Sequence, residues 1–275
     1  MKAFLWGVRG SVPAPGPHTA RYGGNTPCVA VEHEGARLIL DAGTGIRGLG
    51  AAMMVASPEG TANLLLSHVH WDHIQGIPFF APLYSEGWTV RVYGPTPEPG
   101  DLGSALRRQM ASPHFPVHFA SIASRLEVTE ITAEPREIGP FQVEGIVLRH
   151  PGRTFGYRVT PAAGGPSVSY LTDNELAGPG EWGRLVGFLR GTDVLVHDAM
   201  FTEPEARSRE GWGHSSIERV VDLAVAAEVA RVVLFHHDPG RTDEEMDRLL
   251  EAAQARAAGA RSGTKVEAAV EGRTL

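Results

Sequence analysis

The sequence has a single cysteine, only two lysines and no long hydrophobic run. Cys28 alone cannot form an intrachain disulfide or a thiolate metal cage, so packing must stabilise the fold and any metal must use other ligands. No segment approaches the roughly 18 apolar residues that a membrane span needs, and the first ten residues lack the layout of a secretory signal. We therefore expect a cytoplasmic protein with no membrane partner.

The 275 residues carry a formal net charge of −7; 42% of them are hydrophobic and 21% are charged. This composition is typical of a soluble globular protein that is long enough to bury a sizeable core. An acidic chain lacks the broad basic surface with which many proteins bind nucleic acid. Nucleic acid is therefore not the partner that the composition favours.

Short apolar runs that end in Gly, Pro, Asp or Asn predict ten strands, at 2–8, 28–34, 37–41, 62–67, 89–93, 141–148, 155–160, 168–172, 194–197 and 232–235. Helical periodicity predicts helices at 46–55, 74–84, 102–110, 217–230 and 244–258. Ser215 with Glu218, and Thr242 with Glu245, have the spacing of capping boxes at two helix starts. The pattern predicts an α/β fold with helices outside and sheets within. We expect one domain over 1–275, with a surface excursion around 94–136.

Three imidazoles and a carboxylate follow the apolar run 63–66: His68, His70, Asp72 and His73. A strand that ends on such residues places metal ligands at the carboxyl end of a sheet, on a rigid base. Imidazole and carboxylate without thiolate suit zinc, with manganese and iron as competitors. The alternative is a surface turn that is merely rich in histidine. Surface turns, however, rarely gather three imidazoles and an acid behind an apolar strand.

The pattern His68-x-His70-x-Asp72-His73 resembles the HxHxDH motif of the metallo-β-lactamase superfamily. The resemblance is closest to the branch with tRNA 3′-processing endonucleases and cyclic phosphodiesterases. Other segments resemble further elements of the family in the family's order, upstream at 38–43 and downstream at 148–157, 170–173, 195–201, 213–215 and 233–236. The resemblance implies the αβ/βα four-layer sandwich of this family and a metal-dependent hydrolase.

The resemblance also implies two divalent ions, expected to be Zn²⁺, with Mn²⁺ or Fe²⁺ as alternatives. One ion would take His68, His70 and His150, and the other would take Asp72, His73 and His236. Asp173 and a hydroxide would bridge the two ions, and such a hydroxide is a nucleophile at neutral pH. His214 would donate to a phosphate oxygen or to the leaving group. Asp72 and His214 are thus the candidate catalytic residues.

Several of these residue assignments have alternatives. Asp198 also follows an apolar run and competes with Asp173 for the bridge; otherwise it would support a ligand imidazole. His236 is favoured over His237 because adjacent side chains in an extended strand point to opposite faces. Asp41 is expected to orient the ligand loop. The polar segment 21–26 reads equally as a hairpin turn or as a substrate-facing loop.

The expected activity is hydrolysis of a small or cyclic phosphodiester. A tRNA-processing relative would be expected to carry an extended basic arm, whereas 94–136 has scattered arginines, no lysine and several acids. A tRNA 3′-processing-type endonuclease remains an alternative, as does hydrolysis of a lactone, thioester or β-lactam. The alternative from another class is a metal-binding accessory module without turnover. The sequence leaves a homo-oligomer open.

Overall fold

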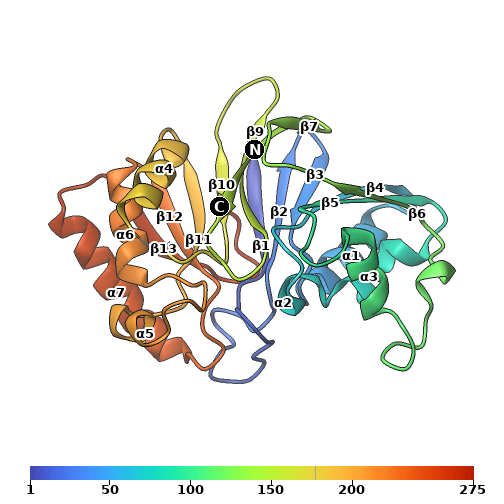
Figure 1. Ribbon diagram of the computed structural model, residues 1–275, viewed down its shortest axis with the longest axis horizontal. Helices are drawn as coiled ribbons and strands as arrows, with labels where there is room; N and C mark the ends of the chain where they lie inside the picture. Colours follow the sequence, from blue (N-terminus) through green and yellow to red (C-terminus); the bar gives the residue numbers. More distant parts are fainter. Residues whose placement is uncertain (177) are drawn as a thin grey trace.

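Two sheets face each other in the computed structural model, which describes residues 1–176 and 178–275 (Figure 1). The first sheet has the order β1-β2-β3-β4-β5-β6. Its strands are β1 Lys2–Gly7, β2 Cys28–His33, β3 Ala36–Leu40, β4 Gly60–Leu65, β5 Trp88–Gly94 and β6 Arg125–Glu130. The second sheet has the order β13-β12-β11-β10-β9-β8-β7. Its strands are β7 Arg136–Ile138, β8 Phe141–Leu148, β9 Thr154–Pro161, β10 Val168–Leu171, β11 Val194–Asp198, β12 Arg231–Phe235 and β13 Lys265–Ala268.

Helices cover the outer face of each sheet. The α-helices are α1 Ile46–Ala56, α2 Trp71–Ile74, α3 Leu102–Gln109, α4 Pro179–Leu189, α5 Glu203–Ser208, α6 Ile217–Ala226 and α7 Asp243–Gly259. Three short 3₁₀ helices are η1 Ile77–Phe79, η2 Ala81–Tyr84 and η3 Phe119–Ser121. Helices α1 and α3 share a hydrophobic cluster with the first sheet, and α4, α6 and α7 share another with the second sheet. The predicted four-layer sandwich is therefore confirmed.

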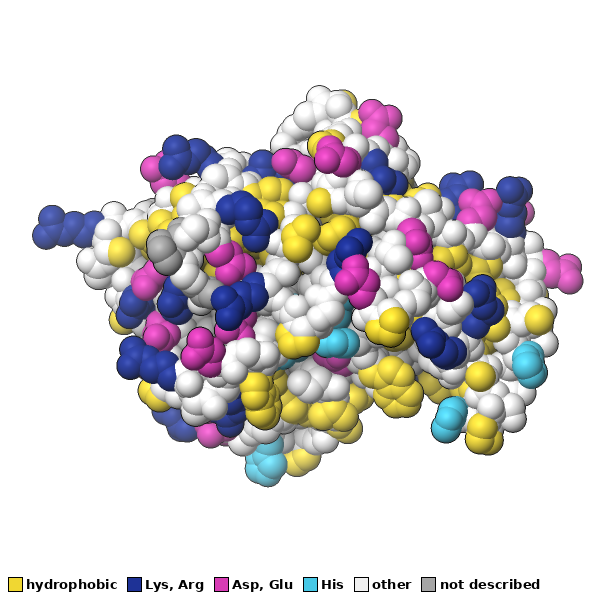
Figure 2. Space-filling model, viewed as in Figure 1, with side chains coloured by type: hydrophobic (Ala, Val, Ile, Leu, Met, Phe, Trp, Pro, Cys, Tyr) yellow, Lys and Arg dark blue, Asp and Glu magenta, His cyan; other side chains and the backbone are white. Residues whose placement is uncertain are grey.

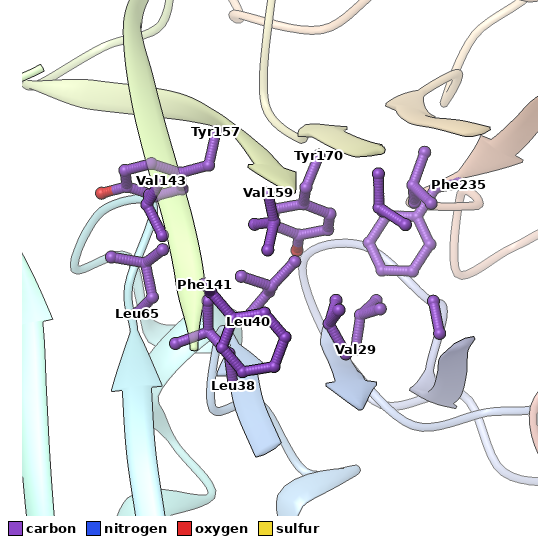
Figure 3. Packing of buried hydrophobic residues seen from close by; sticks show 14 of the residues in the cluster. Val29, Leu38, Leu40, Leu65, Phe141, Val143, Tyr157, Val159, Tyr170 and Phe235 are labelled. Carbon is purple, nitrogen blue, oxygen red and sulfur yellow. The ribbon is translucent and has the colours of Figure 1, made fainter. Parts of the chain in front are cut away.

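The central core lies between the two sheets, where side chains from their inner faces meet. Leu38 and Leu40 from β3 approach Phe141 from β8 and Tyr170 from β10 (Figure 3). These residues are fully buried, as are the alternate residues of the neighbouring strands. Each sheet thus buries one face against its partner and much of the other against helices, which explains why central strands such as β3 and β12 are apolar on both faces.

All ten predicted strands are present, with ends shifted by at most two residues, but some other elements differ. The helix predicted at 74–84 is wrong: α2 ends at Ile74, and η1 and η2 follow. Gly76, Pro78 and Pro82 explain this, because proline in a helix interior removes a hydrogen bond and clashes with the preceding turn. Strands β6, β7 and β13 and helices α4 and α5 were not predicted from the sequence.

Of the two predicted capping boxes, one is confirmed and one is wrong. Thr242 and Glu245 form the reciprocal box at the start of α7. At the start of α6 the cap is Ser216, which accepts from the Arg219 amide. Ser215 instead donates its hydroxyl to the Asn174 carbonyl and so ties the α6 entrance to the loop after β10.

The segment predicted as a surface excursion, 94–136, contains α3, η3 and β6, and β6 pairs in parallel with β5. The organisation of the chain as one domain stays a prediction. None of the helices in residues 1–176 and 178–275 is long and apolar enough to span a membrane.

Candidate metal centre

The polar residues of the candidate site come from the carboxyl ends of five strands. His68 and His70 lie in the loop after β4, and Asp72 and His73 follow in α2. Three further loops bring in the other members of the site: His150 after β8, Asp173 after β10 and His236 after β12. Asp198 is the last residue of β11. Because β10, β11 and β12 run in parallel, their carboxyl ends meet at one edge, where loops from both sheets converge.

Two groups of possible metal ligands share Asp173. In the first group, ligand atoms of His68, His70, His150 and Asp173 all lie within 4.8 Å of one another. His150 Nε2 is 2.9 Å from His70 Nδ1. Asp173 Oδ2 is 3.6 Å from both His68 Nε2 and His150 Nε2. This oxygen therefore faces the first group.

The second group joins Asp72, His73 and His236 to the other oxygen of Asp173. Asp173 Oδ1 is 3.1 Å from His73 Nε2 and 3.1 Å from His236 Nε2. Asp72 Oδ2 lies 3.1 Å from His236 Nε2 and 3.3 Å from His73 Nε2. One carboxylate thus presents one oxygen to each group.

The donor atoms of these two groups would be better satisfied by bound cations than they are by contacts with one another. His73 Nε2 and His236 Nε2 face each other at 3.3 Å, and the buried His68 Nε2 has no hydrogen-bond partner. Nitrogen lone pairs that converge without a donor leave polar groups unsatisfied, which a bound cation would correct. Three imidazoles with a carboxylate, and two imidazoles with two carboxylates, fit two divalent ions.

Asp41 fixes the base of the site. Its carboxylate accepts hydrogen bonds from Ser67 N at 2.7 Å, Ser67 Oγ at 2.8 Å, Tyr170 Oη at 2.8 Å and His73 Nδ1 at 2.7 Å. All four residues are fully buried. Because Asp41 holds the His73 proton on Nδ1, the Nε2 lone pair faces the second group. Asp41 therefore contacts both the ligand loop and β10, and Ser67 and Tyr170 are partners that the sequence analysis missed.

Other imidazoles are oriented in the same way. His150 Nδ1 donates to the Gly213 carbonyl at 3.0 Å, and His68 Nδ1 lies 3.0 Å from Ser67 Oγ. His214 Nδ1 donates to Asp198 Oδ2 at 2.9 Å. Each contact places the proton on Nδ1 and leaves Nε2 available for other bonds.

Backbone at glycines packs directly against the site. A Cβ on Gly10 would lie 2.4 Å from His236 Nδ1, and one on Gly213 would lie 2.1 Å from His150 Nδ1. The Ser11 amide donates to Asp72 Oδ2 at 2.8 Å. The sequence analysis did not assign a role to Gly10, Ser11 or Gly213. The signal for Gly213 was its position next to His214, where a close backbone approach requires that no side chain be present, whereas the sequence around Gly10 offered no such signal.

The protonation of the site follows its burial and its carboxylates. Burial lowers the pKa of His68 well below its usual value, and the neighbouring His73 lowers it further. Burial would also lower the pKa of His73, but Asp173, Asp72 and Asp41 together raise it well above the usual value. Burial opposes charge on His214 as well, yet the adjacent Asp198 raises the pKa of His214 to about 9.

The rival residues lie in different surroundings, and Asp198 also forms a group of possible metal ligands with His214 and His236. Asp173 faces both groups, whereas Asp198 contacts His214 and accepts the amides of Asn174 and Met200. His236 points into the second group at a φ of 59°, so the extended geometry assumed in the sequence analysis ends at Phe235. His237 points the other way and its Nε2 donates to the Ala269 carbonyl.

The start of the segment 21–26 is held against α7. The Arg21 amide bonds the Asp243 carboxylate, and the Arg21 guanidinium forms two bonds with Asp247. Tyr22 is buried and donates its hydroxyl to Asp247. These contacts favour the turn interpretation of the segment.

Comparisons with known proteins identify the family of the chain. The model of the β-lactamase superfamily domain matches residues 36–237. Ribonuclease Z of Natronomonas pharaonis is 24% identical over 299 aligned positions, which cover 90% of this chain and 92% of that protein.

Two solved structures share the fold over the whole chain. The metallo-β-lactamase fold protein YhfI from Bacillus subtilis has a TM-score of 0.74 at 19% identity and is covered over 98% of its length. A diphosphatase from the PhnP family has a TM-score of 0.70 at 20% identity and is covered over 96%. Because the family model spans most of the chain and includes β3, β4, β8 and β10 to β12, the protein belongs to the metallo-β-lactamase superfamily and is a metal-dependent hydrolase.

Proposed function

We propose that this hydrolase is a phosphodiesterase that cleaves a small phosphodiester with two divalent ions. The observation that carries the proposal is the position of Asp173, whose two oxygens face two separate groups of imidazole and carboxylate donors. Paired ions that share a carboxylate are well suited to a phosphoryl centre, where attacking, leaving and non-bridging oxygens all carry negative charge.

The proposed ligands are His68, His70 and His150 for one ion and Asp72, His73 and His236 for the other, with Asp173 shared. Zinc is the expected metal because the donors are nitrogen and oxygen without thiolate, and Mn²⁺ or Fe²⁺ would be accepted by the same donors. When bound, the ions would lower the pKa of a coordinated water and withdraw charge from phosphoryl oxygens.

The chain's own residues prepare the ligands and the proton donor. Asp41 and the Gly213 carbonyl hold ring protons away from the ions, so His73 and His150 keep their Nε2 lone pairs. Asp198 fixes the His214 ring, which stacks on His236 with ring centroids 5.1 Å apart. In this proposal His214 protonates the leaving oxygen as the P–O bond breaks. Asp72 contributes to catalysis through the ion that it binds.

Three observations support a small substrate. The segment 94–136, where an endonuclease would carry a basic arm, forms α3, η3 and β6 along the first sheet. The chain as a whole has a net charge of −7, which opposes binding to a polyanion. The diphosphatase of the PhnP family, a structural neighbour, is consistent with a small phosphoester. The relatives named ribonuclease Z favour a second candidate, a tRNA 3′-processing-type endonuclease.

The test combines metal analysis with a panel of substrates. Purified protein should hold about two divalent ions per chain and should hydrolyse p-nitrophenyl phosphodiesters faster than a phosphomonoester, a lactone, a thioester or a β-lactam. Fast cleavage of precursor tRNA with slow cleavage of small diesters would select the endonuclease instead. Fully loaded protein that cleaves none of these compounds would refute the phosphodiesterase assignment and favour an accessory module.

A further inference from the structure

Glu175 holds the loop that precedes His214. One carboxylate oxygen of Glu175, Oε2, accepts the amides of Gly211 at 2.8 Å and Gly213 at 3.0 Å. Both glycines have a left-handed backbone, with φ of 86° and 85°, which residues with a side chain rarely adopt. Only 12% of the Glu175 side chain is exposed, so these charge-assisted hydrogen bonds are largely shielded from water. Within the described part of the chain, no other side chain bonds an amide of 210–213.

This loop presents two groups to the metal centre. The Gly213 carbonyl accepts from His150 Nδ1 at 3.0 Å, so the position of the carbonyl helps to set the direction of the His150 lone pair. The next residue is His214, whose ring centroid lies 5.3 Å from that of His150. Figure 2 shows histidine side chains at the middle of this face, open to solvent. Trp212 in the same loop is 62% exposed, so Glu175 supplies a hold that burial of this residue does not.

Glu175 belongs to the segment that also carries the shared carboxylate. Asp173 lies two residues before it in the chain and faces both groups of ligands. The Glu175 amide donates to the Arg149 carbonyl at 2.8 Å, which fixes this segment to the chain directly before His150. One short segment therefore contacts the surroundings of the first group of ligands and the loop of His214.

We infer that Glu175 is a positioning residue, which holds the loop 211–214 so that His214 can protonate the leaving oxygen. The same hold keeps the Gly213 carbonyl on His150. Glu175 acts through the two glycine amides and needs no contact with the substrate. Its ion pair with Arg149, at 3.5 Å, contributes little because about half of the Arg149 side chain is exposed. The inference rests on the proposed phosphodiesterase function and adds the residue that sets the position of its proton donor.

Hydrogen exchange and zinc binding measure this hold without turnover. In the zinc protein, Glu175→Ala should speed amide exchange in the peptide 209–216 at least about 10-fold and leave β11 unchanged, because only the loop loses its acceptor. The same variant should weaken one zinc site about 10-fold in chelator competition, since His150 loses a fixed partner. Glu175→Gln keeps a carbonyl acceptor at the same reach and should recover most of both losses. Glu210→Ala removes an exposed carboxylate from the same loop and should match the wild type.

Kinetics at saturating zinc test the position of His214. Glu175→Ala should lower kcat about 10-fold on a diester with an alkoxide leaving group and much less on a p-nitrophenyl diester, because only the alkoxide needs a proton to depart. In the His214→Ala background, the same substitution should change kcat on the alkoxide diester by less than about 2-fold, since the group that Glu175 positions is already absent. A purely structural effect would instead lower kcat on both diesters equally and would add to the loss in His214→Ala.

The outcomes separate the two proposals. If no diester is cleaved but Glu175→Ala speeds exchange in 209–216 and weakens one zinc site, the phosphodiesterase assignment fails and the hold on the loop stands. If diesters are cleaved and Glu175→Ala exchanges like the wild type, or loses kcat equally on both diesters, the positioning role is refuted and the phosphodiesterase assignment stands. A Glu175→Gln variant with wild-type exchange but the full loss of kcat also refutes the positioning role, because the negative charge rather than the hold on the loop would then matter.

Discussion

Asp41→Asn isolates the contribution of the carboxylate beneath the metal centre. Asparagine keeps the size of the side chain and tolerates the left-handed backbone at residue 41, where φ is 57°. Of the two orientations of the asparagine amide, the one that loses fewer hydrogen bonds turns the NH₂ group toward Ser67 N. That backbone donor is then unpaired, which costs ~1–3 kcal/mol of stability. The hydrogen bond from His73 Nδ1 also loses its charged acceptor, which costs a further ~1 kcal/mol of stability. Metal-free protein should therefore lose about 2–4 kcal/mol of unfolding free energy.

The same change should also weaken metal binding. Without the carboxylate, the His73 ring is less firmly held and is a weaker base, and loss of such a partner typically costs 10- to 100-fold in metal affinity. Urea unfolding of chelator-treated protein measures the first effect, and zinc competition with a chromogenic chelator measures the second. Asp222→Asn is the control, because Asp222 is an exposed partner of Arg256 and should change stability by less than about 1 kcal/mol. Wild-type stability and zinc affinity in Asp41→Asn would refute the reasoning.

Four further substitutions test the site. Asp173→Ala should remove both ions because its oxygens face both groups, whereas Asp198→Ala should retain them; equal metal loss in elemental analysis would contradict this. His214→Ala should keep the metal and lower kcat about 100-fold on a diester with an alkoxide leaving group, but less on a p-nitrophenyl ester. A loss independent of leaving group would indicate phosphate binding instead. Gly213→Ala would place a Cβ 2.1 Å from His150 Nδ1 and should weaken one zinc site, so unchanged zinc affinity would contradict that geometry.

Local sequence signals predicted much of the fold because strand ends and helix caps depend on neighbouring residues. The capping box at Thr242 and the strand at Phe141–Leu148 are examples. Prediction failed where apolar spacing alone was read as a helix, since Pro78 and Pro82 break that segment into 3₁₀ turns. It also missed β7 and β13, whose three and four residues carry too little pattern to distinguish a strand from a loop.

The sequence by itself determined the chemistry of the candidate site. Three imidazoles and an acid behind a buried strand, in a chain with one cysteine, restrict a metal to nitrogen and oxygen donors. Local order also placed these residues at strand ends, because apolar runs stop where the chain leaves the core. These conclusions depend on residues that lie close together in the chain.

Only the tertiary structure decided which distant residues meet. The two sheets pack so that the loop after β4 faces the loops after β8, β10 and β12, and this packing brings Asp173 between both groups of histidines. The same packing buries Asp41 against Tyr170 and turns His236 inward while His237 turns away. It also brings Glu175 onto the amides of Gly211 and Gly213. Such contacts join residues up to 164 positions apart, and their geometry depends on how whole sheets pack rather than on any local pattern.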